Sequence, residues 1–176
     1  MEFICKTDKT TVREIAESFF KLYKNDAEAL SSDLVDKTFD IFDSESYINE
    51  HCDTIDNSSP AQFISKVNMA DLDNDSIIIV EGLMAKYSEE QLYALIAHEI
   101  GHCVYDNGSS GVLEEIKADS FARDLGLGSS MIKAIEIMKD CHKKNPNTVL
   151  ISLFGNEKSN ENPIKDFDKR ISALQP

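Results

Sequence analysis

Two histidines and a glutamate stand within five residues in the segment His98-Glu99-Ile100-Gly101-His102. Histidines four positions apart lie on one face of a helix, so their ring nitrogens can bind the same zinc ion. A glutamate directly after the first histidine can act as general base for a water molecule that the metal activates. This spacing predicts a metalloprotease site with His98 and His102 as metal ligands and Glu99 as the catalytic base.

The residues before this segment predict the helix that the histidine spacing requires. Ser88 and Gln91 stand in the arrangement of a capping box, which marks the start of a helix. Apolar residues then follow at helical spacing, namely Leu92, Leu95, Ile96 and Ile100. We therefore expect a helix over about residues 88–105, with a core face that is distinct from the histidine face.

A catalytic zinc site needs a third protein ligand and an open position for water. Glu115 and Asp119 are four residues apart, on one face of a second predicted helix that follows a turn at residues 107–111 and runs to about Leu125. Glu115 is the predicted third ligand, and Glu114 is its rival. Asp119 is predicted to accept a hydrogen bond from the non-ligating nitrogen of a zinc histidine. The alternative is an ordinary solvated acidic helix face.

The chain resembles the gluzincin metallopeptidases, and more narrowly the family of HtpX and the type I CAAX prenyl proteases. The resemblance extends from residue 68 to residue 174 in matching order. Besides the zinc pentapeptide it includes residues 68–70, 77–84 and 87–92, Glu115 to Asp119 with Ala122, Asn162-Pro163, and Arg170-Ile171 with Leu174. Asn162 departs from the histidine of many members, and residues 1–60 match no part of the family. The resemblance implies a zincin-like catalytic domain with one Zn²⁺ per chain, acting on polypeptide substrates.

The remaining pattern predicts a single domain, 1–176, of the α+β class and mostly helical. Residues 1–60 would form an N-terminal helical part and residues 61–176 the catalytic core. Predicted helices outside the zinc site cover about 11–30, 33–42, 46–52, 130–143 and a last segment from Pro163. Strands at about 61–69 and 77–81 would form a small antiparallel sheet, or hairpin, beside the zinc helix.

Composition excludes several classes of partner. The chain has 18 basic and 32 acidic residues, a formal net charge of −14, which disfavours nucleic acid and anionic membranes. No apolar run approaches the roughly 18 residues that a membrane-spanning helix needs. The N-terminus lacks a signal peptide, and four scattered cysteines indicate free thiols, so we expect a soluble cytoplasmic protein. The sequence assigns no oligomeric state.

Two questions stay open at this level. The residue that stabilises the oxyanion could be Asn68, His142 or Arg123, or else Tyr105 or Asn162. The function could also differ from general proteolysis. The alternatives are a metal-binding regulatory protein without activity, a purely structural zinc site, and a metallopeptidase that cleaves repressors of a mobile element.

Overall fold

The computed structural model describes residues 1–51, 59–65, 72–105, 111–144 and 163–175. Contacts divide the chain into two compact units, Met1–Ala85 and Lys86–Pro176. This division lies well after residue 60, where the sequence suggested a boundary, because the later strands pair with earlier ones inside the first unit. The organisation as one domain stays a prediction.

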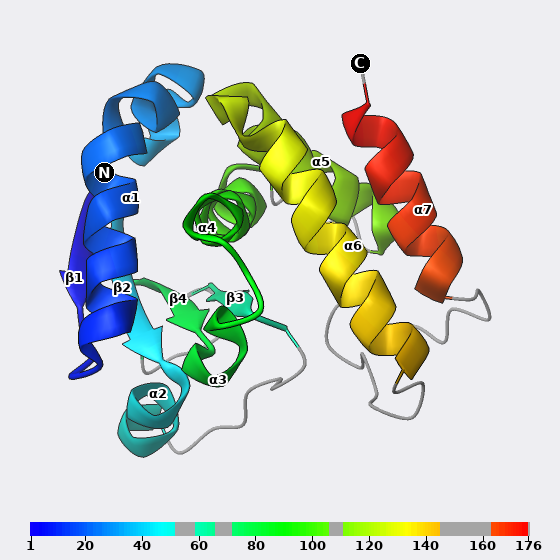
Figure 1. Cartoon of the computed structure of the whole chain (residues 1–176). Coiled ribbons are helices and arrows are strands. Elements are labelled where there is room, and N and C mark those ends of the chain that lie inside the picture. Colours follow the sequence, from blue (N-terminus) through cyan, green and yellow to red (C-terminus); the bar gives the residue numbers. More distant parts are fainter. Residues whose placement is uncertain (52–58, 66–71, 106–110, 145–162, 176) are drawn as a thin grey trace. The chain divides into compact units, whose positions relative to one another are not determined.

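The first unit contains a four-stranded mixed sheet (Figure 1). Its strands are β1 (Glu2–Cys5), β2 (Thr38–Asp43), β3 (Ala61–Ile64) and β4 (Asp75–Ile79), in the spatial order β1-β2-β4-β3. The pairs β1/β2 and β2/β4 are parallel, and β3/β4 is antiparallel. The α+β class is therefore confirmed, and so is the antiparallel pairing of the two predicted strands, which are β3 and β4. As a description of the whole sheet the antiparallel prediction is wrong, because β1 and β2 join it in parallel.

The helix predicted at residues 33–42 is also wrong. The structure has a single 3₁₀ turn, η1 (Ser32–Leu34), followed by β2. Five of the six β2 residues are buried, since this strand has a parallel neighbour on each side. Strands that are buried on both faces have apolar residues without strict alternation. The spacing of Phe39, Ile41 and Phe42 is therefore compatible with a helix as well as with a buried strand, which explains the wrong prediction.

Two predicted helices of the first unit are confirmed. Helix α1 (Thr10–Leu30) connects β1 to β2, and its Phe19 ring stacks on Phe3 with centroids 6.1 Å apart. Helix α2 (Ser44–His51) follows β2 directly, and the short α3 (Glu81–Met84) follows β4.

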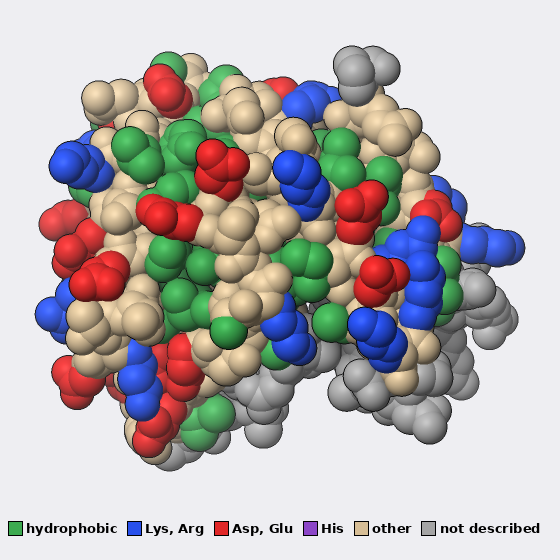
Figure 2. Space-filling view, viewed as in Figure 1, with side chains coloured by type: hydrophobic (Ala, Val, Ile, Leu, Met, Phe, Trp, Pro, Cys, Tyr) green, Lys and Arg blue, Asp and Glu red, His purple; other side chains and the backbone are tan. Residues whose placement is uncertain are grey.

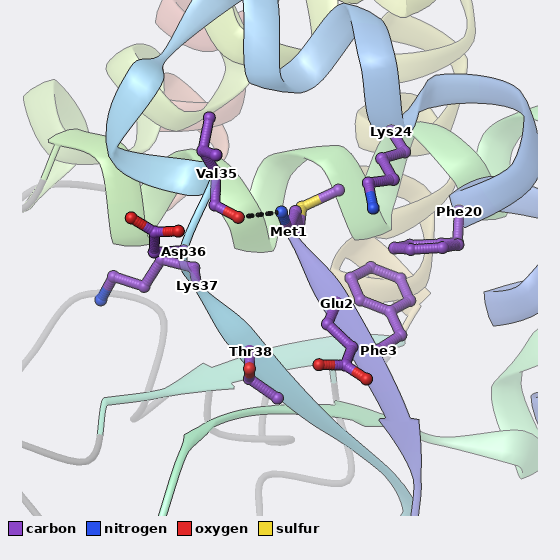
Figure 3. A pocket seen from close by; sticks show the side chains of 9 residues that line it. All are labelled: Met1, Glu2, Phe3, Phe20, Lys24, Val35, Asp36, Lys37 and Thr38. Atoms are coloured by element: carbon purple, nitrogen blue, oxygen red, sulfur yellow. Dashed lines mark hydrogen bonds between the residues drawn. The ribbon is translucent and has the colours of Figure 1, made fainter.

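A cavity of about 580 Å³ lies at the start of β1 (Figure 3). Met1, Glu2, Phe3, Phe20, Lys24, Val35, Asp36, Lys37 and Thr38 line it. The Met1 amino group donates to the Val35 carbonyl at 2.6 Å and contacts the Glu28 carboxylate. Lys37 is paired with Asp75 at 2.8 Å. The Met1 amino group thus links β1 to α1 and to the segment before β2, and Lys37 links that segment to β4.

The second unit is helical, with α4 (Glu89–Tyr105), α5 (Val112–Ala122), α6 (Gly128–Lys144) and α7 (Pro163–Leu174). All four helices were predicted. The capping box forms at the start of α4, where the Ser88 N–H donates to Gln91 Oε1 at 2.7 Å and the Gln91 N–H donates to Ser88 Oγ at 3.4 Å. None of the described helices is both long and apolar enough to cross a membrane.

Helix α5 packs closely against α4 at Gly101. A Cβ atom at this position would lie 2.7 Å from the Ala118 carbonyl oxygen and 2.8 Å from its Cα. Every residue of α4 from Leu92 to Gly101 is buried, including His98, whereas the His102 side chain is 15% exposed. No histidine is visible among the described residues on the face in Figure 2. Gly126, with φ of 82°, then breaks the helix within η2 (Arg123–Leu127) and redirects the chain into α6.

Candidate metal centre

The three predicted metal ligands lie together between α4 and α5. His98 Nε2 and His102 Nε2 are 3.1 Å apart. Glu115 Oε2 is 3.5 Å from the first nitrogen, and Glu115 Oε1 is 3.4 Å from the second. Ligand atoms around a tetrahedral zinc with bonds of about 2.0–2.1 Å are separated by about 3.3 Å. The donor set therefore fits a zinc ion in both chemistry and spacing.

The other ring nitrogen of each histidine faces a different carboxylate. Asp119 Oδ1 is 2.8 Å from His98 Nδ1, and Glu114 Oε1 is 3.3 Å from His102 Nδ1. The Glu114 side chain is 30% exposed, compared with 6% for Glu115. The geometry thus separates the two rivals, because Glu115 faces the inner nitrogens and Glu114 an outer one.

Glu99 is buried in the same cluster. Its carboxylate and the nitrogens of His98 and His102 lie within 4.8 Å of one another, so by distance alone Glu99 could also reach a metal. The Glu115 oxygens lie 3.4–3.5 Å from the two Nε2 atoms. Burial raises the pKa of Glu99, although both histidines oppose the shift.

Sequence reasoning assigned no role to Arg170, which reaches this cluster from α7. Its Nε donates to Asp119 Oδ2 at 2.7 Å and its Nη2 donates to Asp119 Oδ1 at 2.8 Å. Its Nη1 lies 2.8 Å from Glu115 Oε2, an ion pair without hydrogen-bond geometry. The three side chains are almost completely buried. Only the Arg170-Ile171 motif in the sequence hinted at this residue, since 51 positions separate it from Asp119.

These contacts set the charges of the cluster. Burial alone would raise the pKa values of Glu115 and Asp119, but Arg170 and His98, joined at Glu115 by His102, together outweigh it and hold both pKa values below their ordinary range. Burial also works against the charged form of His102, yet the Glu115 carboxylate prevails and raises the pKa of this histidine to about 9. Both carboxylates are therefore anionic at neutral pH.

The oxyanion candidates that the structure describes do not join this cluster. Arg123 is half exposed and binds Asp124, with Nη2 2.9 Å from Oδ1. His142 lies on α6 beside Phe167, with ring centroids 6.4 Å apart. In the described ranges neither makes a polar contact with the cluster. Tyr105 packs edge-on against Phe121, and Asn68 and Asn162 lie outside the described residues.

Residues 68–113 match the sequence model of peptidase family M48. The chain is a relative of peptidase family M48. The M48 match contains His98, Glu99 and His102 and ends two residues before Glu115. It indicates a metallopeptidase, a class that acts on polypeptides. No curated protein and no solved structure matched the chain.

Proposed function

We propose that this M48 relative is a zinc-dependent endopeptidase with a zincin-like catalytic fold, in which His98, His102 and Glu115 hold one zinc ion. The observation that supports this assignment is that the two histidine Nε2 atoms lie 3.1 Å apart and that each lies 3.4–3.5 Å from one oxygen of the Glu115 carboxylate. Because only three side chains supply ligands, a fourth position is left for water or substrate, as catalysis requires.

Glu99 is the proposed general base. A zinc ion in this position supplies Lewis-acid activation of water and polarises the peptide carbonyl. Glu99 takes a proton from the attacking water and passes it to the leaving amine as the bond between carbonyl carbon and nitrogen breaks. The raised pKa of Glu99 suits a group that must both accept and return a proton.

Asp119 is proposed to hold His98 in its working tautomer. His98 Nδ1 lies 2.8 Å from Asp119 Oδ1, an ion-pair contact without full hydrogen-bond geometry, and a proton kept on Nδ1 by this carboxylate leaves the Nε2 lone pair for the metal. Glu114 stands in the same relation to His102 at 3.3 Å, although it is more exposed. The cytoplasmic location stays a prediction from the sequence.

The test is hydrolysis of an unfolded polypeptide by the zinc-loaded chain and by Glu99→Gln. We expect Glu99→Gln to keep its zinc and to lose activity by about 10²–10⁴-fold, the usual contribution of a general base. Glu90→Gln makes the same chemical change at an exposed position of α4 and should remain active. A zinc-loaded wild-type chain that cleaves nothing would contradict the endopeptidase assignment, and so would an active Glu99→Gln.

A further inference from the structure

Arg170 lies on the buried face of α7, the last helix of the second unit. Asp166, Phe167, Arg170 and Leu174 form this face at helical spacing. The guanidinium is only 1% exposed and lies against α5. A buried charge is costly unless it is fully paired, so this arginine must be compensated by its neighbours.

The guanidinium contacts three different carboxylate oxygens with its three nitrogens. Nε and Nη2 bind both oxygens of Asp119, at 2.7 and 2.8 Å. Nη1 lies 2.8 Å from Glu115 Oε2. A planar fork of this kind fixes the orientation of its partners, which a single ammonium group does not.

Fixing Asp119 also fixes His98. Asp119 Oδ1 is shared between Arg170 Nη2 and His98 Nδ1, both at 2.8 Å. Rotation of this carboxylate would therefore break its contacts with both partners. The imidazole plane is held through this chain of contacts from α7 to α4.

Fixing Glu115 determines which of its oxygens is free. The two oxygens lie at similar distances from the histidines, Oε2 3.5 Å from His98 Nε2 and Oε1 3.4 Å from His102 Nε2, but Oε2 is also paired with Arg170 Nη1 at 2.8 Å. The carboxylate can then present Oε1 as a single ligand atom. Single-atom ligation conserves the open corner that a catalytic site needs.

We propose that Arg170 is the positioning residue of the metal centre, with a fork that holds Glu115 directly and His98 through Asp119 before a metal arrives. This inference rests on the proposed metal site. The proposal assigns the effect to the planar shape of the guanidinium and not to its charge alone. A lysine at this position would keep the charge but could not make the forked contacts.

The test compares Arg170→Lys with the wild-type chain and with Arg123→Lys, the same substitution at a half-exposed arginine. Zinc affinity is measured by competition with a chelating dye, and ligand geometry by the visible spectrum of the Co²⁺ form. We expect Arg170→Lys to bind zinc about 10–100-fold more weakly, as when outer partners of metal ligands are lost, and to give an altered Co²⁺ spectrum. Arg123→Lys should match the wild type in both.

The outcomes separate this inference from the proposed function. If the wild type binds both metals and Arg170→Lys matches it in affinity and spectrum, the inference is overturned and the metal site stands. If the wild-type chain binds neither metal, the proposed function is overturned and the inference with it.

A second measurement uses only the wild-type chain and so does not depend on whether a variant folds. The chain has three arginines, Arg13, Arg123 and Arg170, so its arginine Nε–H region in a ¹H–¹⁵N spectrum is simple to assign. In the zinc-free wild type we expect the Arg170 Nε–H to exchange with solvent much more slowly than that of Arg123. Equal exchange rates would show that the fork is not in place before metal binding and would overturn the proposal.

Discussion

Each unit of the molecule contains a buried aspartate whose pKa is lowered, but the two are held by different kinds of donor. Asp43 in the first unit accepts hydrogen bonds from the Thr7 and Ser46 hydroxyls and from the backbone N–H groups of Glu45 and Ser46. Asp119 in the second unit is paired with a guanidinium and an imidazole.

The difference shows what each carboxylate is used for. The neutral donors of Asp43 include the first backbone N–H groups of α2, so this aspartate caps a helix. The partners of Asp119 come from two other helices, α4 and α7, and one of them is a predicted metal ligand. A low carboxylate pKa alone therefore does not identify a functional residue, whereas the identity of the donors does.

The largest expected effect is that of Glu115→Ala on zinc affinity. Loss of a direct ligand should weaken binding by more than the roughly 100-fold upper range for an outer partner. Glu114→Ala, one residue earlier and on the outer side of His102, should cost much less. A zinc titration of both variants checks this, and equal losses would mean that the two glutamates have been distinguished incorrectly.

Asp119→Asn and Asp43→Asn test the comparison directly. Asp119→Asn should weaken zinc binding by about 10–100-fold, because His98 loses the carboxylate that orients its ring. Asp43→Asn should leave zinc affinity unchanged, since its partners all belong to the first unit. Similar zinc affinities for the two variants would remove the functional distinction between the aspartates.

Gly101→Ala tests how closely α4 and α5 must approach. The new Cβ would meet backbone atoms of Ala118 at 2.7–2.8 Å, so a helix must move, and we expect a loss of about 1–3 kcal/mol in unfolding free energy. Gly82→Ala, in α3, meets nothing within 4 Å and should be neutral or slightly stabilising. Thermal or denaturant unfolding measures both variants. A stable Gly101→Ala with normal zinc affinity would show that the contact does not position Glu115.

The smallest effect concerns acid stability. Burial opposes ionisation of Asp43, but hydrogen bonds from Ser46 and Thr7 outweigh it and lower its pKa in the folded chain. This aspartate therefore contributes stability that is present above its unfolded pKa of about 3.9 and is lost as the pH falls through the lower folded value. Unfolding free energies of wild type and Asp43→Asn should differ most above pH ~4 and converge in stronger acid. Thr7→Ala, which removes one donor, should give an intermediate curve.

Elements defined by interactions between residues close together in the sequence were predictable, whereas elements defined by long-range pairing were not. Helices α4 and α7 carry local signals, the Ser88–Gln91 capping box and a proline at the first helical position, and both were found from them. Strands β1 and β2 were missed because parallel pairing joins residues that are far apart in the chain and leaves no local turn signal.

The candidate site divides in the same way. His98, Glu99 and His102 follow from a five-residue spacing, and Glu115 and Asp119 from the next helix along the chain. Arg170 could not be assigned, because only the packing of α7 on α5 brings it to Asp119. The close approach of α5 to α4 at Gly101 likewise depends on tertiary packing, which no periodicity reveals.

The central claim is that two histidines of α4 and one glutamate of α5 hold a single zinc ion. Its most direct test is elemental analysis of the wild-type chain and of a His98→Ala/His102→Ala double variant, each stripped with a chelator and reloaded with zinc. We predict one zinc per wild-type chain and none in the double variant. A wild-type chain that retains no zinc, or a double variant that retains a full equivalent, would contradict the account.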